Sequence, residues 1–198
     1  MAKKVIVLLA EGFEEVEAVT SIDFLRRGGL EVTIAAVGTG AAAGKGAAVT
    51  GSHGITVEAD AALGELAGKG AAPWDAVVCP GGLPGAANLA ASGEAGALLA
   101  GMAGSGKWVC AICAAPALVL APLGLLKGKK FTGYPGLEQS VPSTPSGGAV
   151  FLEDRVVVDG NIITSRGPGT AGVFAAAIVG KLVSAAEEEK LLRAALLS

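Results

Sequence analysis

Short apolar runs that end at turn residues alternate along this chain with segments of helical period. Because a strand, a helix and a further strand normally return parallel to the first strand, this alternation predicts a mainly parallel sheet with helices on both faces. The run 75–79 is almost continuously apolar, as expected for a strand buried on both faces. Strands are predicted at 4–10, 30–37, 55–59, 75–79 and 108–112, and helices at 14–28, 94–103, immediately after residue 113, 170–184 and 186–197.

Two further apolar runs, 155–158 and 162–165, are joined through Asp159-Gly160-Asn161 and predict a β-hairpin. Residues 38–51 are rich in Ala and Gly and are predicted to form a loop. The chain shows neither an internal repeat nor a linker, and its 198 residues suffice for a substantial core. We therefore expect a single α/β domain over residues 1–198.

Composition excludes several classes of protein. Hydrophobic residues make up 52% and charged residues 17%, which excludes a disordered chain. The net charge is -3 without a basic stripe, so no stable nucleic-acid binding is expected. The apolar run 5–10 is too short for a membrane span or a signal-peptide core. Three cysteines cannot all pair, which favours a reducing cytoplasmic location, or an organelle such as the chloroplast if a transit peptide was removed.

Cys113 lies where a predicted strand ends and a helix is predicted to begin, with small residues on both sides. A tight turn there would project the thiol from the carboxyl edge of the sheet, where open α/β sheets bind ligands. A helix N-terminus beside the sulfur would favour the thiolate and lower its pKa. The turn Gly81-Gly82, after another strand, can point backbone amides into the same space as an oxyanion hole. The competing interpretation is a buried, unreactive cysteine.

Cys110 and Cys113 form a Cys-x-x-Cys pair, which raises the question of a redox dithiol. Cys110 falls inside the predicted strand, where three extended residues span about 10 Å. A disulfide tolerates a Cα separation of about 4.4–6.8 Å, so this pairing is not favoured. Cys79 and Cys110 are instead expected in the cores of their strands.

The chain has one histidine, His53, in a Gly-rich segment, and none after the candidate nucleophile. A Cys-His triad is therefore not favoured. Acidic residues offer another partner for the thiol. Glu14 and Glu15 suit the first turn of a helix, whereas Glu17 is flanked by apolar residues. A carboxyl buried there would stay protonated, donate a hydrogen bond to a thiolate and shuttle a proton to a substrate carbon.

Four motifs in order resemble those of the DJ-1/PfpI superfamily, and within it the DJ-1 branch (Parkinson disease protein seven-like). They extend over nearly the whole chain, and together they are highly specific. The motifs are 9–17 (LAEGFEEVE), 78–82 (VCPGG) with 88–89 (NL), 111–116 (AICAAP) and 164–170 (TSRGPGT).

This resemblance implies a flavodoxin-like three-layer sandwich and a homodimer with the active site near its interface. Cys113 would be an oxidation-prone nucleophile of low pKa, Glu17 the protonated carboxyl beside it, and the amides of Gly82 and Ala114 the oxyanion hole. No cofactor and no metal are implied. Further residues expected at the pocket or in its support are Gly81, Tyr134, Pro168, His53, Glu14 and Arg27.

Two positions depart from patterns within the superfamily. Tyr134 stands where the animal member has a histidine near the nucleophile, so a histidine's part in proton transfer is not assumed. Ala114 follows the nucleophile where the protease-like and chaperone-like branches carry histidine, which places this chain outside them.

The resemblance implies a glutathione-independent glyoxalase of the lactate-forming, hydro-lyase type. It would convert methylglyoxal to lactate and glyoxal to glycolate through a hemithioacetal on Cys113, with small dicarbonyls as substrates. A deglycase (hydrolase) activity on early glycation adducts is also implied. The alternative is a non-enzymatic redox-sensing stress protein or chaperone in which Cys113 is oxidised. A peptidase is not favoured, because the expected histidine is absent.

Overall fold

The computed structural model of the chain describes residues 2–38, 47–68, 70–142 and 148–198. The strands are β1 (Lys4–Ala10), β2 (Glu31–Val37), β3 (Ala48–Thr50), β4 (Thr56–Glu58), β5 (Ala61–Ala62), β6 (Ala76–Cys79), β7 (Trp108–Ile112), β8 (Lys130–Phe131), β9 (Val150–Phe151), β10 (Val156–Asp159) and β11 (Ile162–Ser165). The α-helices are α1 (Glu15–Arg27), α2 (Leu63–Ala67), α3 (Gly85–Ala91), α4 (Gly93–Gly104), α5 (Ala171–Leu182) and α6 (Ala185–Ala194). Shorter helices are the π-helix η1 (Pro116–Leu120) and the 3₁₀ helices η2 (Leu137–Ser140) and η3 (Pro168–Thr170).

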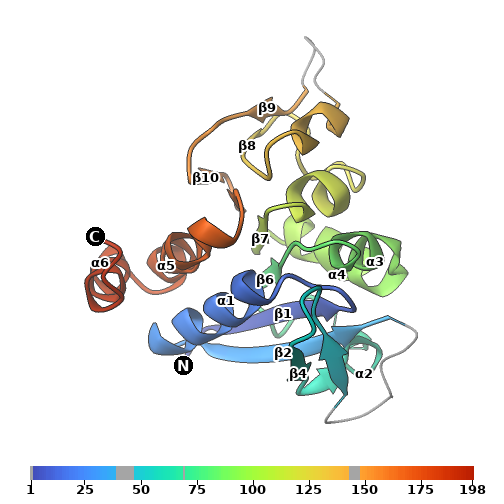
Figure 1. The fold of residues 1–198 in the computed structure, drawn as a ribbon, viewed down its shortest axis with the longest axis horizontal. Helices are drawn as coiled ribbons and strands as arrows, with labels where there is room; N and C mark the ends of the chain where they lie inside the picture. Colours follow the sequence, from blue (N-terminus) through green and yellow to red (C-terminus); the bar gives the residue numbers. More distant parts are fainter. Residues whose placement is uncertain (1, 39–46, 69, 143–147) are drawn as a thin grey trace.

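A seven-stranded sheet in the order β10-β11-β7-β6-β1-β2-β5 runs through the molecule. Its neighbouring strands are parallel except for the hairpin β10–β11. Helices α1, α5 and α6 cover one face, and α2, α3 and α4 cover the other (Figure 1). The architecture is the expected flavodoxin-like sandwich, and Val5 to Ala10 of the central strand β1 are all buried.

The sheet contains a point at which the direction of chain progression reverses. From β1 the chain passes to β2 on one side, and it later returns to β6 on the other side of β1. The carboxyl ends of β1, β6 and β7 therefore meet at the reversal, where open α/β sheets bind ligands. Cys113, the Gly81-Gly82 turn and the segment leading to Glu17 all follow these three strands.

Helix α1 begins and ends at capping residues, and one of its faces is buried in the molecule. The Glu14 carboxylate caps it by accepting from the Glu17 amide at 2.7 Å, and Gly28 ends it. The buried residues of the helix include Ser21, Ile22 and Leu25, one to two turns after Glu17. Because residues four apart share a face, the apolar residues that bury α1 also bury Glu17.

The predicted strands are confirmed for β1, β2, β4, β6, β7, β10 and β11, and the predicted helices for α1, α4, α5 and α6, with ends within three residues. The predicted loop 38–51 is wrong in part, because Ala48–Thr50 forms β3, which pairs with β4; residues 39–46 lie outside the described part. The helix predicted after Cys113 is only the short π-helix η1 followed by turns. Strands β5, β8 and β9 and helices α2 and α3 were not predicted.

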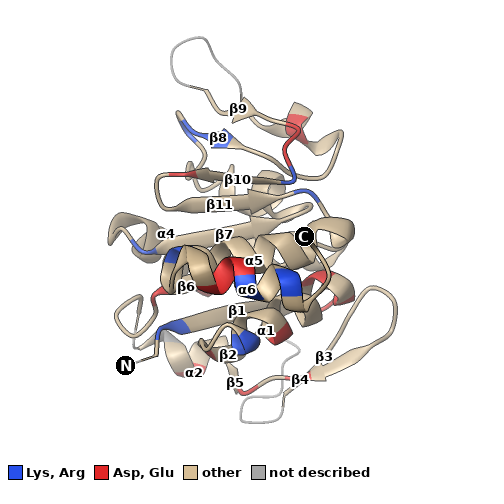
Figure 2. Cartoon of the chain, turned by 90° about the vertical axis from the view of Figure 1, so that its left-hand side faces the viewer, with Lys and Arg blue, Asp and Glu red and all other residues tan. Residues whose placement is uncertain are grey.

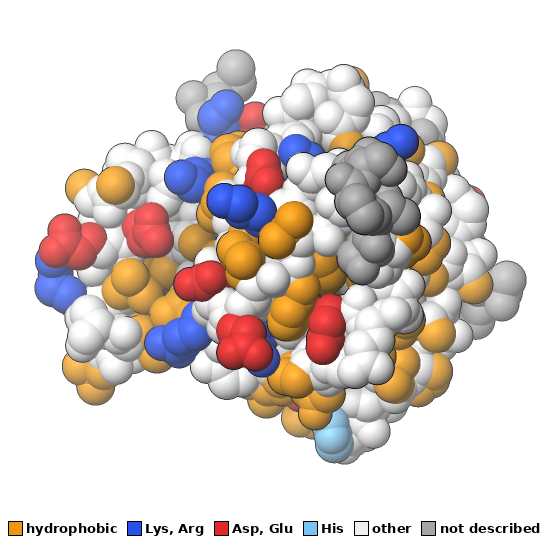
Figure 3. Space-filling view, turned by 90° about the horizontal axis from the view of Figure 1, so that it is seen from above, with side chains coloured by type: hydrophobic (Ala, Val, Ile, Leu, Met, Phe, Trp, Pro, Cys, Tyr) orange, Lys and Arg blue, Asp and Glu red, His pale blue; other side chains and the backbone are white. Residues whose placement is uncertain are grey.

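The surface carries both signs of charge, with acidic and basic residues interspersed along the elements seen in Figure 2. Apolar side chains are also exposed, and Figure 3 shows them grouped between charged ones on one face. Val16 and Val19 on α1 are about half exposed, at 51% and 46%.

The homodimer implied by the family resemblance stays a prediction. No helix in the described part of the chain combines the length and the apolar composition needed to span a bilayer.

Candidate active site

Cys113 is the first residue after β7, and its backbone has a φ of 63°, in the left-handed region. A residue with a side chain seldom adopts this conformation, so neighbouring segments must hold it. The Cys113 amide donates to the Ser165 carbonyl at 3.0 Å, and the Cys113 carbonyl accepts from the Tyr134 amide at 2.8 Å. These bonds fix the sharp strand-to-turn reversal that was predicted for the nucleophile.

The Gly81-Gly82 turn packs directly against Cys113. A Cβ added at Gly81 would lie 2.6 Å from the Cys113 Cβ and 2.9 Å from Glu17 Oε2, so only glycine fits between the two side chains. Gly82 has a φ of +93°, and its amide, with that of Ala114, donates to the Cys113 sulfur. The predicted oxyanion donors therefore converge on the thiol.

Glu17 is completely buried beside this turn. Its Oε2 accepts from the Gly81 amide at 2.8 Å, and its side chain also hydrogen-bonds with Cys113. Burial raises the pKa of Glu17 to about 7, against the lowering effect of the Gly81 amide and Cys113. Glu17 is therefore partly protonated at neutral pH, and the shift has the direction expected from its burial.

The expected low pKa of Cys113 is not what the structure shows. Burial raises the pKa of the thiol to about 12, and the charge of Glu17 adds to this, whereas the amides of Gly82 and Ala114 act in the opposite direction. The favourable helix N-terminus was also overestimated, because η1 has only five residues. The ionisation of Cys113 thus depends on whether Glu17 is charged.

Glu14 supports the site from the other side of Gly81. Its amide donates to the Gly81 carbonyl at 3.0 Å while its carboxylate caps α1. The preceding Gly12 accepts from the Gly85 amide at 3.0 Å, which joins the loop after β1 to the start of α3. Glu14 therefore links the segment carrying Glu17 to the turn that carries the oxyanion donors.

His53 pairs with Glu15 rather than serving as a base for Cys113. The buried Glu15 carboxylate accepts from the His53 amide at 2.5 Å and contacts His53 Nδ1 at 2.8 Å. Burial would raise the pKa of Glu15, but the bonds from the side chain and amide of His53 outweigh it and lower that pKa to about 2. The same bond raises the pKa of His53. Donor atoms of Glu14, Glu15 and His53 lie within 4.8 Å of one another, but Glu15 is already engaged in holding the β3–β4 hairpin.

The bonds that the Glu15 carboxylate accepts from His53 and from the Ile55 amide, here called the Glu15 clamp, have a testable effect on stability. Because folding lowers this pKa from 4.5 to about 2, ionised Glu15 stabilises the fold above pH about 4.5, and this stabilisation is lost as pH falls toward 2. Glu15→Gln is expected to reduce the free energy of unfolding by about 3 kcal/mol at pH 7 and by little at pH 2. Urea unfolding across this range measures the difference. Glu31→Gln, at an exposed surface pair, is the control and should change little; a loss independent of pH would contradict the clamp.

The remaining predicted residues fall into two groups. Tyr134 is 51% exposed, and its ring lies 3.6 Å from the position of a Cβ added at Gly167, so Tyr134 and the segment carrying Pro168 are neighbours beside Cys113. Arg27 lies in the last turn of α1, ten residues and about 15 Å along the helix from Glu17. It pairs there with Asp23 at 2.6 Å, and its place at an interface stays a prediction.

The motif 164–170 acts on the site through Ser165. The Ser165 hydroxyl donates to the Arg155 carbonyl at 2.7 Å and lies 2.7 Å from Thr170 Oγ1. Thr170 Oγ1 also accepts from the Gly167 amide at 3.1 Å. The motif thus fixes the end of β11, whose Ser165 carbonyl holds the Cys113 amide.

Cys79 and Cys110 are completely buried strand residues, as predicted, and all three cysteines are free. Burial raises the pKa of both thiols, that of Cys79 to about 12.

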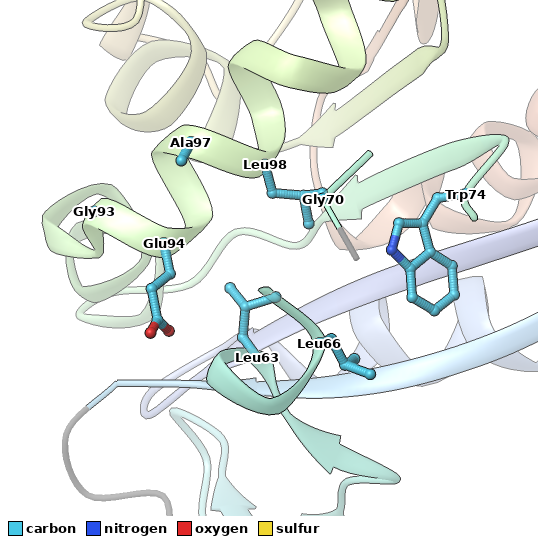
Figure 4. A pocket seen from close by; sticks show the side chains of 8 residues that line it. All are labelled: Leu63, Leu66, Gly70, Trp74, Gly93, Glu94, Ala97 and Leu98. Atoms are coloured by element: carbon cyan, nitrogen blue, oxygen red, sulfur yellow. The ribbon is translucent and has the colours of Figure 1, made fainter. Parts of the chain in front are cut away.

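A cavity of about 350 Å³ between α2 and α4 is separate from the site around Cys113 and Glu17 (Figure 4). It is lined by Leu63, Leu66, Gly70, Trp74, Gly93, Glu94, Ala97 and Leu98.

This arrangement of a thiol, a buried carboxyl and two amides lies within a region that matches a known family. Residues 3–181 match the DJ-1/PfpI family. The chain belongs to the DJ-1/PfpI family. Drosophila melanogaster protein dj-1beta is 37% identical to this DJ-1/PfpI chain over 199 residues, covering 100% of this chain and 99% of the relative. The crystal structure of Drosophila melanogaster DJ-1beta superposes with a TM-score of 0.88, at 36% identity and 100% coverage of both chains.

Two further members of the family bear on function and on length. The Caenorhabditis elegans glutathione-independent glyoxalase DJR-1.2 is 34% identical over 188 residues, covering 95% of this chain and 92% of that protein. Protein DJ-1 homolog A of Arabidopsis thaliana is 39% identical over 180 residues, covering 91% of this chain and 43% of the plant protein. The chain thus spans less than half the length of this plant DJ-1/PfpI relative.

Proposed function

We propose that this protein is a cofactor-independent glyoxalase that converts methylglyoxal to lactate and glyoxal to glycolate. The observation that carries the proposal is the completely buried Glu17, hydrogen-bonded to Cys113 and to the Gly81 amide, next to two amides aimed at the sulfur. The arrangement supplies a nucleophile, one acid/base and oxyanion donors, which are the groups this reaction needs. The relative DJR-1.2, named a glutathione-independent glyoxalase, supports it.

The first step forms a bond between the Cys113 sulfur and the aldehyde carbon of methylglyoxal. The aldehyde oxygen becomes an oxyanion, which the amides of Gly82 and Ala114 stabilise. The carboxyl proton of Glu17 then passes to this oxygen, which gives a hemithioacetal and leaves Glu17 as a carboxylate. The Glu17 carboxylate then removes the proton from the former aldehyde carbon and returns it to the neighbouring ketone carbon. The hydroxyl proton of the hemithioacetal moves to the ketone oxygen, which leaves a lactyl thioester on Cys113. Water attacks this thioester, releases lactate and restores the thiolate. The net reaction consumes one water and needs no external oxidant or reductant.

The raised pKa of Glu17 is what makes a thiolate accessible. While Glu17 is protonated it carries no charge to oppose the thiolate, and its proton can be donated to the sulfur. The pair then holds one proton, and the oxyanion donors favour the charge on sulfur. Burial is the largest cause of the high pKa of Cys113 and the charge of Glu17 adds to it, so protonation of Glu17 removes the second contribution. A protonated Glu17 is therefore required for nucleophilic attack near neutral pH.

The effect of Glu17 on the thiol can be measured through alkylation of Cys113 by iodoacetamide across pH. Glu17→Gln is expected to move the midpoint upward by about one pH unit, because an amide donates a weaker hydrogen bond to the thiolate than a carboxylic acid does. If the charge resided on Glu17 instead, the neutral glutamine would move the midpoint down, which would contradict the proposal. Glu11→Gln is the matched control, because Glu11 is exposed and bonds to the Thr50 amide.

The direct test is lactate formation from methylglyoxal by purified protein without glutathione. Lactate above the level produced by Cys113→Ala supports the proposal, and equal amounts from both proteins would overturn it. Deglycase activity and oxidation sensing would draw on the same thiolate, and both stay predictions.

A further inference from the structure

Two buried polar atoms on one face of α1 have no hydrogen-bond partner among the described residues. One is Glu17 Oε1, the carboxyl oxygen that the Gly81 amide does not contact. The other is the hydroxyl of Ser21, which is completely buried. Buried polar groups are nearly always hydrogen-bonded, so two neighbouring exceptions need a common explanation.

Helical geometry places these two side chains together. Ser21 follows Glu17 by four residues in α1, which stacks them on one face with Cβ atoms about 5–6 Å apart. Side chains on a helix lean toward its N-terminus, so the Ser21 hydroxyl leans toward the turn that carries Glu17. A hydroxyl in this place faces the part of the helix that carries the free carboxyl oxygen, and each of the two atoms lacks the partner that the other can supply.

We propose that the Ser21 hydroxyl is the second hydrogen-bond donor to Glu17, bonding Oε1 directly or through one water, and that it positions this carboxyl beside Cys113. With Gly81 holding Oε2 and Ser21 holding Oε1, the carboxyl plane is fixed at both oxygens. Oε2 is the oxygen on the side of Cys113, since a Cβ added at Gly81 would lie 2.9 Å from Oε2 and 2.6 Å from the Cys113 Cβ. Ser21 thereby keeps the proton-carrying carboxyl aimed at the sulfur.

The proposed bond from Ser21 changes the pKa of Glu17 in one definite direction. A hydroxyl bonds more strongly to a charged carboxylate than to a neutral carboxyl, so Ser21 favours the ionised form of Glu17. Removing the hydroxyl should therefore raise the pKa of Glu17 further. The other titratable groups acting on Glu17 are Cys113, across the Gly81 turn, and Glu14, at the start of α1. The elements that pack most against α1, namely α5, β2 and β1, bring Lys181, Glu31 and Lys4, all exposed.

The test is a pH titration of the ¹³C-labelled carboxyl of Glu17 by NMR, assigned with Glu17→Gln. It is made in the Cys113→Ser background, so that no thiolate shares the proton. Ser21→Ala is expected to raise the Glu17 midpoint by about one pH unit, the size of one hydrogen bond to a charged group. Ser21→Thr keeps a hydroxyl and is expected to restore the original midpoint. An unchanged or lowered midpoint in Ser21→Ala would overturn the assignment.

Controls separate positioning from general effects on the helix. Thr20→Ala removes the adjacent, half-buried hydroxyl of the same helix and is expected to leave the Glu17 midpoint unchanged. Alanine is favourable in helices, so both alanine variants should fold, which thermal unfolding verifies. The inference deepens the proposed function, but the titration needs no turnover. Its failure would therefore leave the glyoxalase proposal standing, and a failed glyoxalase assay would leave the Ser21–Glu17 contact standing.

Discussion

Replacing Cys113 with alanine is expected to reduce lactate formation from methylglyoxal by about 10³-fold or more. The reason is that Glu17 and the amides of Gly82 and Ala114 converge on this sulfur, so the remaining groups have no covalent intermediate on which to act. Backbone structure should survive, because the main-chain bonds of Cys113 to Ser165 and Tyr134 do not involve the side chain. The measurement is the initial rate of lactate release without glutathione, with circular dichroism to verify folding.

Cys110→Ala is the matched control. It makes the same change three residues earlier, inside β7, at a completely buried thiol whose burial raises its pKa. It should cost some stability through a small cavity, but catalysis should remain. Equal loss of activity in the two variants would show that β7 had been disturbed as a whole. It would contradict the proposal that the Cys113 thiol is the nucleophile.

The second large effect is expected from Gly81→Ala. The added Cβ would lie 2.6 Å from the Cys113 Cβ, 2.9 Å from Glu17 Oε2 and 3.0 Å from the Ala114 amide nitrogen. Overpacking of this kind costs about 1–3 kcal/mol, which lowers the unfolding midpoint of a chain of this size by about 2–12 °C. The nucleophile, its acid/base and one oxyanion donor would all be pushed apart, and a displacement of about 1 Å can reduce the rate by about 10²-fold.

Gly104→Ala provides the comparison for this substitution. Gly104 is in α4, has no atom within 4 Å of an added Cβ and lacks a positive φ. Alanine there should stabilise the helix slightly and leave lactate formation unchanged. Unaltered activity in Gly81→Ala would mean that Glu17 and Cys113 need not touch for catalysis, contrary to the proposed mechanism.

The parts of the fold that the sequence predicted are those with a strong local signal. Strands β1 and β7 are apolar runs closed by turn residues, and their observed bounds are the predicted ones. Strand β3 was missed because three residues at the edge of an Ala/Gly-rich segment carry no alternation. The helix after Cys113 stays short because Pro122 follows it closely and cannot donate a backbone hydrogen bond.

For the candidate site, the residues that lie together could be predicted from motifs in the sequence, whereas the pKa of Cys113 depends on the folded surroundings. The family resemblance implied that Cys113, Glu17 and the amides of Gly82 and Ala114 share one site, and the structure brings these groups together, while their catalytic roles stay a prediction. The direction of the Cys113 pKa shift was wrong, because it depends on burial and on the charge state of a carboxyl that is distant in sequence. Ser21 was also missed, although its spacing of four residues from Glu17 in the predicted helix was a usable signal.

The left-handed backbone at Cys113 restricts how this position can evolve. At a φ of 63°, β-branched side chains are excluded, and even an unbranched one is held against its own conformational preference. Glycine or asparagine would occupy the turn with less strain. A lineage released from the need for the thiol would therefore gain stability by drifting to those residues. The cysteine at this turn therefore costs the chain some thermodynamic stability that glycine or asparagine would not cost.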